Sequence, residues 1–189
     1  MMTVGRIKKE LEGHPYLALP EHISMASILD DMLTFARSDT NDIGLEKLSL
    51  PSLLTSICDN LEDEGKDASF ESGGRMTVMG DRTSLKRGFL NLIENGTKYG
   101  LRSRVSTERT DSGRVRVIID DDGPGIAEDQ REAVFQPFVR LEDSRNRMTG
   151  GTGLGLAIVK KVMDRHKADI SLHESPSGGL RVVVEMDLA

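Results

Sequence analysis

Several residue types that would identify a fold or a site are scarce in this sequence. Its 189 residues include one cysteine, Cys58, and no tryptophan. A lone cysteine excludes an internal disulfide and a cysteine-based zinc cluster, and it fits a reducing compartment. No apolar run approaches the roughly 20 residues of a membrane span, and no signal peptide pattern is present. We therefore expect a cytoplasmic chain.

Positive charge is also in the minority. The sequence has 25 lysines and arginines against 31 aspartates and glutamates, which gives a net charge of -6. This balance argues against a general nucleic-acid surface, so we expect no nucleic-acid partner. The length suits one domain with an appendage, or one large domain.

The first 40 residues differ from the rest in pattern. Arg6 to Glu12 reads as a polar helical stretch, and Glu21 to Arg37 as a second helix with an apolar stripe, Met25, Ile28, Met32 and Phe35. Such a stripe suits one helix of an antiparallel hairpin or dimer bundle, but a helix packed on its own domain would carry it too. The polar linker 38–44 marks the expected boundary, with domains at 1–40 and 45–189.

The remainder alternates between strand and helix patterns. Strands are predicted near residues 46–50, 68–71, 75–80, 102–109, 114–120, 169–174 and 180–187. Helices are predicted at 51–65, from a cap at Asp81 or Thr83 to Tyr99, at 128–134, and after Gly151. Cys58 lies near the apolar face of the first of these helices, so we interpret it as a small core residue.

A glycine turn precedes the last predicted helix. It reads Gly151-Thr152-Gly153-Leu154-Gly155-Leu156, with glycines at alternate positions. Glycine is costly inside a helix or strand, but it lets a backbone come close to a partner. The unpaired N–H groups at the helix start would then suit a phosphate. A glycine-rich loop before a buried helix explains the motif equally well.

A polar face is predicted on the helix that ends near Tyr99. Asn91, Asn95, Lys98 and Tyr99 recur at helical spacing and share one side. An amide oxygen suits Mg²⁺, which keeps waters and substrate phosphates in its shell, and a lysine adds a charge for phosphate. A solvated polar face is the equal alternative.

An acidic strand end and an aromatic segment follow. Asp120-Asp121-Asp122-Gly123-Pro124-Gly125-Ile126 closes a β-branched strand. A carboxylate held there could accept a hydrogen bond from an exocyclic amine such as adenine N6, or the run could be only a polar strand exit. Phe135-Gln136-Pro137-Phe138-Val139-Arg140 then leads into 141–150, which we interpret as a mobile lid.

Together these segments resemble the sequence boxes of bacterial sensor histidine kinases. Residues 91–100 are similar to the N box, 121–126 to the first glycine box, 135–138 to the F box, and 151–156 to the second glycine box. All four occur in family order and cover about residues 46–188. The resemblance implies an α+β fold: a two-layer α/β sandwich of the Bergerat type, with a mixed sheet and helices on one face. It also implies that the first 40 residues form a partial dimerisation hairpin.

The resemblance also implies roles for individual residues. Asn91, Asn95 and Lys98 would be the catalytic residues, and Asn95 would hold Mg²⁺ on the phosphates. Asp121 would accept the adenine amine. The nucleotide-binding set would be Asn95, Lys98, Tyr99, Asp121, Gly123, Gly125, Ile126, Arg140, Gly151, Thr152, Gly153, Leu154 and Gly155. The implied cofactors are ATP and Mg²⁺.

Two departures refine this expectation. Related ATPases such as gyrase and Hsp90 use a glutamate one turn before the metal asparagine, where this sequence has Asn91; Glu94 lies about 100° round the helix. This favours transfer to a protein side chain over hydrolysis. The phosphoacceptor pattern His-Glu-x-Arg-Thr-Pro is missing, and His14, His22, His166 and His173 all lie in other contexts.

The expected function is therefore the Mg-ATP-binding kinase domain of a sensor histidine kinase, acting on a histidine that this sequence does not show. The implied partners are a response-regulator receiver domain, a phosphoacceptor helix and, through residues 21–37, a second copy of the chain. The parent kinase would be anchored in the inner membrane. The alternatives are a non-catalytic nucleotide-binding module and a serine kinase of the same superfamily.

Overall fold

The computed structural model describes residues 44–141 and 152–189. The expected hairpin in the first 40 residues, most of the expected lid and Gly151 lie outside these residues. The domain boundary near residue 40 therefore stays a prediction.

A five-stranded sheet forms one layer of the described structure, in the order β2-β4-β5-β7-β6. Its strands are β2 (Asp67–Glu71), β4 (Arg102–Arg109), β5 (Arg114–Asp121), β6 (Asp169–Glu174) and β7 (Leu180–Asp187). β2 runs parallel to β4, and the other neighbours are antiparallel. β1 (Glu46–Ser49) and β3 (Thr77–Gly80) form a separate antiparallel pair, which the sequence did not reveal.

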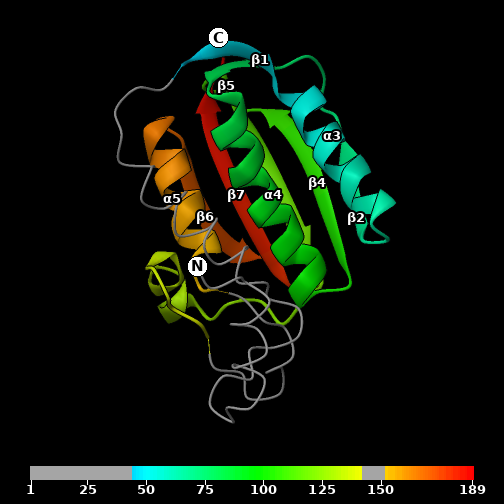
Figure 1. Cartoon of the computed structure of the whole chain (residues 1–189), viewed down its shortest axis with the longest axis vertical. Helices are drawn as coiled ribbons and strands as arrows, with labels where there is room; N and C mark the ends of the chain where they lie inside the picture. The colour runs from blue at the N-terminus through cyan, green and yellow to red at the C-terminus, as the bar shows by residue number, and fades with distance from the viewer. Residues whose placement is uncertain (1–43, 142–151) are drawn as a thin grey trace, which may run out of the picture.

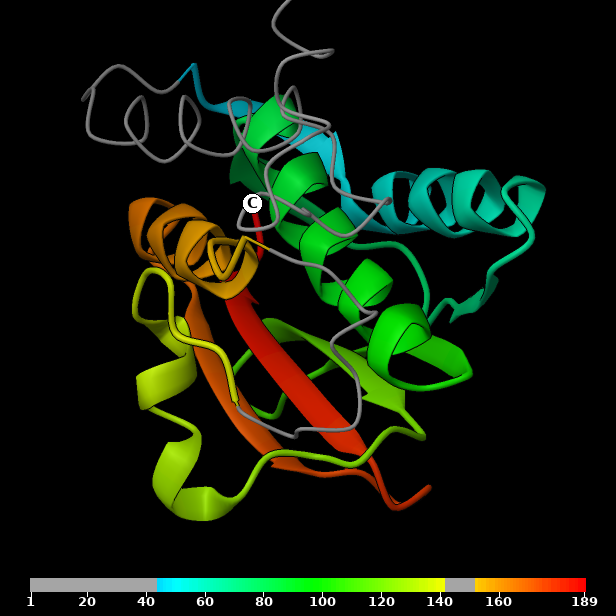
Figure 2. The ribbon, with the colours of Figure 1, turned by 60° about the horizontal axis from the view of Figure 1, so that its bottom comes forward.

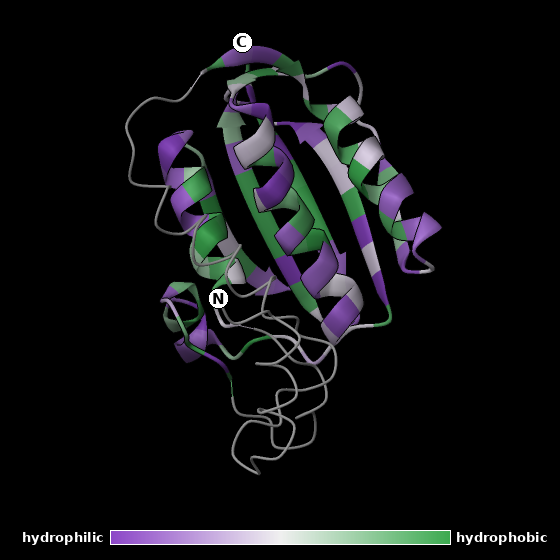
Figure 3. Cartoon of the chain, in the orientation of Figure 1, coloured by the Kyte–Doolittle hydropathy of each residue, from purple (hydrophilic) through white to green (hydrophobic). Residues whose placement is uncertain are grey.

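In the described part of the chain, three helices form the second layer and cover one face of the sheet (Figures 1 and 2). They are α3 (Leu50–Asp63), α4 (Arg82–Tyr99) and α5 (Gly155–Arg165). Their apolar sides face inward, as the hydropathy colouring in Figure 3 shows. Leu54, Phe89 and Ile158 are fully buried in the core between the layers. The mixed sheet with helices on one face confirms the predicted fold class.

Within residues 44–141 and 152–189, no helix covers the second face of the sheet, and the alternation of β5 agrees with this. Val115, Val117 and Ile119 point into the core, as expected for a strand with one buried face. On the opposite face, Arg116 forms ion pairs with Glu108 and Glu185. A face of paired charges needs no covering layer.

Sequence signals placed most element boundaries correctly. Asp81 caps α4, since its Oδ1 accepts a hydrogen bond from the Ser84 N–H at 2.8 Å. Cys58 is buried, and burial raises the pKa of its thiol to about 11, which confirms it as a core residue. The helix expected at 128–134 is wrong as an α-helix: the structure has two single turns of 3₁₀-helix, Glu128–Gln130 and Ala133–Phe135. Neither turn has a side-chain cap and only Val134 is buried, so nothing supports a longer helix.

His166 joins the end of α5 to the start of α4. Its Nδ1 donates to the Val162 carbonyl oxygen at 2.7 Å, and its Nε2 accepts from the Asp81 N–H at 3.0 Å. These bonds fix one neutral tautomer and occupy both ring nitrogens. His166 is therefore a structural histidine, whereas His173 is exposed and contacts Ser171 on its own strand.

The His166→Ala variant should lose about 1–3 kcal/mol of unfolding free energy, because it leaves the Asp81 N–H and the Val162 carbonyl without this partner. Urea unfolding followed by circular dichroism measures the loss. His173→Ala is the matched control, and it should change the stability by less than about 0.5 kcal/mol. Equal effects of the two substitutions would contradict the bridging role.

Candidate functional site

Asp121 ends β5 with its side chain turned inward. The residue is 9 % exposed, and its Oδ1 accepts hydrogen bonds from the Gly123 and Leu180 N–H groups, each at 2.9 Å. Ser177 Oγ donates to the Asp121 carbonyl oxygen at 3.0 Å. The turn after β5 and the turn before β7 thus hold this carboxylate in one orientation.

Burial raises the pKa of the Asp121 carboxyl, and the two N–H donors only partly oppose that shift. Because the native pKa lies above the unfolded value, ionisation of Asp121 costs stability as the pH rises through the native pKa. An ionised carboxylate has about four lone-pair sites, so two N–H donors leave acceptor capacity for a ligand. The protein thus keeps a costly charge in a place where it can bind a donor.

Glycines allow the backbone to approach this carboxylate. A Cβ at Gly179 would overlap Asp121 Oδ1 and the Asp121 carbonyl oxygen, and would lie 2.6 Å from the Gly123 nitrogen. A Cβ at Gly123 would lie 2.9 Å from the Tyr99 carbonyl oxygen. Gly125 has φ +71°, in the left-handed region that favours glycine.

Asp122, directly after β5, holds the end of β5 to the start of β4. Its Oδ1 accepts from the Leu101 and Arg102 N–H groups, and its Oδ2 accepts from Arg102 Nε at 2.8 Å. The Arg102 hydrogen bond and the two backbone donors lower the pKa of Asp122 to about 2. Both oxygens of the Asp122 carboxylate thus accept hydrogen bonds within the fold, whereas the two hydrogen bonds that the Asp121 carboxylate accepts from the described residues both go to Oδ1.

The predicted polar face lies on α4. Asn91 Oδ1 is 4.0 Å from the position that a Cβ would take at Gly155, so the amide faces the start of α5. Asn91 Nδ2 is buried without a hydrogen-bond partner among the described residues. Asn95 and Lys98 are half-buried, and the Lys98 ammonium lies 5.4 Å from the centre of the exposed Tyr99 ring.

The glycine turn packs directly on the F-box segment. Phe138 donates its N–H to the Gly153 carbonyl at 2.9 Å, and a Cβ at Gly153 would lie 2.9 Å from Phe138 Cα. Gly153 has φ +71° and Phe138 has φ +66°, so both residues take the left-handed conformation. Two motifs that are 15 residues apart in sequence therefore form one backbone unit.

The first turn of α5 offers backbone donors. Leu154 precedes the helix without a side-chain cap, and its N–H bonds to Thr152 Oγ1 at 3.2 Å. The first intrahelical bond runs from Ile158 N–H to the Leu154 carbonyl. The N–H groups at the beginning of a helix have no intrahelical partner and favour an anion.

The structure brings most predicted residues to one end of the layers. The end of β5, the polar face of α4 and the start of α5 meet there, since Gly96 packs on Asp121 and Asn91 faces Gly155. Ile126 packs against the core. Arg140 is exposed at the edge of the described segment, and Gly151 lies outside it.

Sequence reasoning missed the β7 side of this site. Gly179 and the Leu180 N–H support Asp121 as directly as Gly123 does. The available signal was the glycine pair Gly178-Gly179 directly before the last predicted strand. Ser103, which is buried beside Gly96, was missed as well.

Glu94 is engaged away from the site. Lys66 Nζ donates to Glu94 Oε1 at 2.6 Å, and it also pairs with Glu64. This ion pair agrees with the prediction that Glu94 does not serve as the base of a hydrolase.

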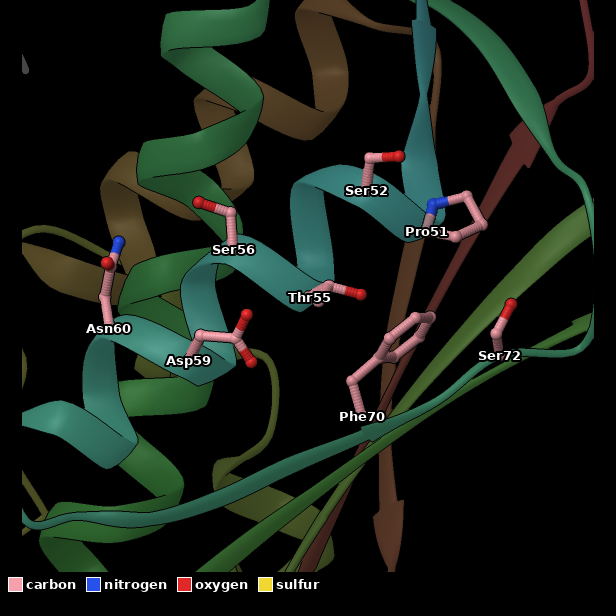
Figure 4. A pocket seen from close by; sticks show the side chains of 8 residues that line it. All are labelled: Pro51, Ser52, Thr55, Ser56, Asp59, Asn60, Phe70 and Ser72. Carbon is pink, nitrogen blue, oxygen red and sulfur yellow. The ribbon is translucent and has the colours of Figure 1, made fainter.

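A surface hollow between α3 and β2 contains none of the site residues predicted from the sequence. Figure 4 shows an open, mainly polar hollow between α3 and β2, lined by Pro51, Ser52, Thr55, Ser56, Asp59, Asn60, Phe70 and Ser72. None of these residues belongs to the four boxes. Within residues 44–141 and 152–189, no group of three or more His, Cys, Asp or Glu residues could hold a metal ion.

With this geometry in place, comparison with known proteins defines the class. The model of the histidine kinase-, DNA gyrase B- and HSP90-like ATPase family matches residues 80–189, more than half of the chain. The chain belongs to this family, and the described part is its ATP-binding domain. None of the described helices has the length and apolar character needed to cross a membrane.

Within this family, the individual relatives that resemble the chain are sensor histidine kinases. The chain is 31% identical over 168 residues to the sensor histidine kinase CpxA of Escherichia coli, covering 86% of this chain and 37% of CpxA. It is 32% identical over 192 residues to CusS of the same organism, covering 98% of this chain and 40% of CusS. The chain thus spans about two fifths of these relatives.

Solved structures share the fold. Full-length ShkA in complex with AMPPNP aligns with a TM-score of 0.73 at 26% identity, covering 86% of this chain and 35% of ShkA. The mycobacterial sensor histidine kinase MprB aligns with a TM-score of 0.66 at 26% identity, covering 76% of this chain and 97% of that structure.

Gly179→Ala should destabilise the protein by about 1–3 kcal/mol, because the added methyl overlaps the Asp121 carboxylate and backbone. Thermal unfolding measures this loss. Gly44→Ala is the matched control, since nothing lies within 4 Å of a Cβ there. A Gly179→Ala protein as stable as the control would show that the carboxylate is not packed as described.

Acid should weaken the stabilisation that Asp122 provides through its hydrogen bonds to Leu101 and Arg102. Its native pKa of about 2 lies below the ordinary 3.8, so its stabilising contribution is complete above about pH 4 and is lost as the pH falls towards 2. Asp122→Asn should therefore unfold at a lower temperature than the unsubstituted protein at pH 6, with the two curves converging towards pH 2. Thermal scans across pH 2–6 test this, and parallel curves would refute it.

Proposed function

We propose that this chain is the ATP-binding catalytic domain of a sensor histidine kinase, which transfers the γ-phosphoryl group of ATP to a histidine on an acceptor helix. The observation that carries the proposal is the meeting of three chemistries at one end of the fold. These are the oriented Asp121 carboxylate, the amide and lysine face of α4, and the backbone donors at the start of α5.

The carboxylate side of this end is the proposed base pocket. Asp121 accepts a hydrogen bond from the exocyclic amine of adenine, for which its orientation leaves acceptor capacity. Gly123, Gly125 and Ile126 shape the pocket, and the exposed ring of Tyr99 packs beside the nucleotide.

The side between α4 and α5 is the proposed phosphate site. Backbone N–H groups of Gly151, Thr152, Gly153, Leu154 and Gly155 contact the triphosphate, with the charges of Lys98 and Arg140 nearby. Asn91 Nδ2 has no hydrogen-bond partner among the described residues, and a phosphate oxygen would accept its hydrogen bond.

The residues present fit a magnesium ion. Mg²⁺ is bound through few protein oxygens plus waters and phosphates, and the half-buried amide of Asn95 supplies one such oxygen. When bound, the ion neutralises charge on the phosphates. Asn95 holds and orients it, and Asn91 lies one helical turn before.

Transfer to a side chain fits this site better than hydrolysis. Position 91 carries an amide, which cannot accept a proton from water, and Glu94 is paired with Lys66. Phosphoryl transfer requires positioning and charge neutralisation more than covalent help from the protein. The chain's own residues orient the triphosphate, and the γ-phosphate stays accessible to the imidazole of an acceptor histidine.

The acceptor histidine is none of the four histidines of this sequence. His166 uses both ring nitrogens in the fold, and His173 lies on the outer strand β6. The acceptor helix belongs to the same or a partner kinase, and a response-regulator receiver domain takes the phosphoryl group onward. Residues 21–37 contribute to a homodimer, and the parent kinase sits at the inner membrane with this domain in the cytoplasm.

Incubation with γ-labelled ATP, Mg²⁺ and the separate dimerisation and phosphoacceptor domain of a related sensor kinase tests the proposal. The added domain should become labelled, and the label should be lost in acid, as expected for phosphohistidine. Asn95→Ala should reduce labelling by at least 100-fold, about 2.7 kcal/mol. Asn60→Ala, on the outer face of α3, is the matched control and should label normally.

Three outcomes would contradict this function. Nucleotide binding without transfer to any histidine acceptor would favour a regulatory module. An acid-stable product would indicate a serine kinase. Rapid labelling of this chain at His14 or His22 would show that it carries its own acceptor.

A further inference from the structure

The hollow between α3 and β2 lies where the sheet ends (Figures 1 and 4). Its lining comes from these two elements and from Ser72, directly after β2. In the described part of the chain, β2 pairs with β4 on one side and with no strand on the other. An edge strand presents a row of unpaired backbone N–H and C=O groups, and extended peptides bind to such edges by adding a strand. Here the free edge borders a hollow next to a helix.

The edge strand is held in place by contacts with β4. At its start, Arg104 donates to both carboxylate oxygens of Asp67, at 2.6 and 3.0 Å. Just past its end, the Gly73 N–H donates to Thr107 Oγ1 at 3.1 Å. A Cβ at Gly73 would overlap the Thr107 carbonyl, so the backbone packs closely on β4 there. β2 is therefore a preformed edge, and preorganisation lowers the cost of binding a partner.

Phe70 gives the hollow an apolar contact surface. Its side chain packs against the core but is only half-buried, and Figure 4 shows the ring directed towards Thr55 and Pro51 of α3. Successive side chains of a strand point to opposite faces, so an added strand would place every second side chain on the helix side. An apolar side chain at one such position would cover the exposed part of the Phe70 ring.

The charges around the hollow favour a basic occupant. Among the described residues, the lining contains one charged side chain, Asp59, and Glu62 lies about one turn further along α3. Both are exposed, and α3 contains no lysine, arginine or histidine. Lys66, which follows the helix, is paired with Glu64 and Glu94. A lysine or arginine of a partner would therefore find carboxylates that α3 itself does not neutralise.

A second copy of the same strand fits this edge less well. If two β2 strands paired antiparallel about Ser69, Asp67 of each strand would lie directly opposite Glu71 of the other. Like charges directly opposite each other destabilise a sheet. The acidic residues at both ends of β2 thus discourage self-association, whereas they attract a basic strand.

We propose that the free edge of β2 and the hollow beside α3 form a docking site for an extended, basic segment of a partner protein. The segment adds a sixth strand to the sheet. One of its apolar side chains covers Phe70, and a lysine or arginine on the same side of the added strand pairs with Asp59. The docking site shares no lining residue with the proposed nucleotide site, so partner and nucleotide can bind together.

The blocked peptide Lys-Thr-Val-Thr-Lys is the probe, because it reads the same in both directions and places valine and both lysines on one side. Titration into the isotope-labelled 189-residue chain should shift the amide NMR signals of β2 saturably, with a Kd below about 1 mM. Asp59→Asn should weaken binding about two- to fivefold, as expected for an exposed ion pair. Asp129→Asn, exposed on the 3₁₀ turn Glu128–Gln130, is the matched control and should bind normally.

Two further peptides separate strand pairing from charge attraction. The same peptide with its three central residues N-methylated keeps every side chain but loses those N–H donors, and Glu-Thr-Val-Thr-Glu reverses the charge. Each should bind at least about tenfold more weakly.

Four outcomes would overturn the docking site. They are equal binding of the methylated peptide, equal binding of the acidic peptide, no saturable shift in β2, and an unaltered affinity of Asp59→Asn. Signals of β2 that change with protein concentration in the absence of peptide would assign the edge to a second copy instead. The titrations contain no nucleotide, so these results leave the proposed function untouched.

Discussion

The hydrogen bonds from Gly123 and Leu180 to the Asp121 carboxylate are the constraint on which the site depends. They connect the end of β5 to the start of β7, so two segments almost 60 residues apart define the direction of one side chain. Burial makes the charge costly, which is visible in its raised pKa. Gly179 and Gly123 permit the close approach that these bonds need. The protein thus trades stability for an oriented acceptor, as binding sites often do.

The other parts of the site follow from packing against this point. α4 approaches β4 and β5 at Gly96 and carries Asn91, Asn95 and Lys98 past the carboxylate. α5 packs beside α4 and brings its unpaired first turn towards Asn91. The F-box backbone is bonded to Gly153, so any displacement of one moves the other. The proposed base pocket, the proposed phosphate site and the aromatic segment therefore contact one another through packed backbone, which suits a domain that positions a nucleotide.

Much of this arrangement could be predicted from the sequence, because local signals agreed with the fold. Apolar periodicity located α3, α4 and α5, and strand patterns located β5 and β7. Of the two expected caps of α4, Asp81 and Thr83, the structure has Asp81. Four motifs in order identified the family, and they supplied most residues of the proposed site. Contacts between distant segments escaped prediction: the β1–β3 pair, the support of Asp121 by Leu180, and the His166 bridge depend on tertiary packing. The 3₁₀ turns were missed because residue propensity could not show that only Val134 would be buried.

The most direct test of this account is calorimetric titration of a non-hydrolysable ATP analogue, with Mg²⁺, into the Asp121→Asn protein. The asparagine oxygen can keep both backbone hydrogen bonds, but its NH₂ group then faces the adenine amine as a second donor. We expect a loss of affinity of at least tenfold with heat stability kept or increased, while Asp111→Asn, in the exposed β4–β5 turn, binds normally. Undiminished binding by a folded Asp121→Asn protein would contradict the assignment of the base pocket.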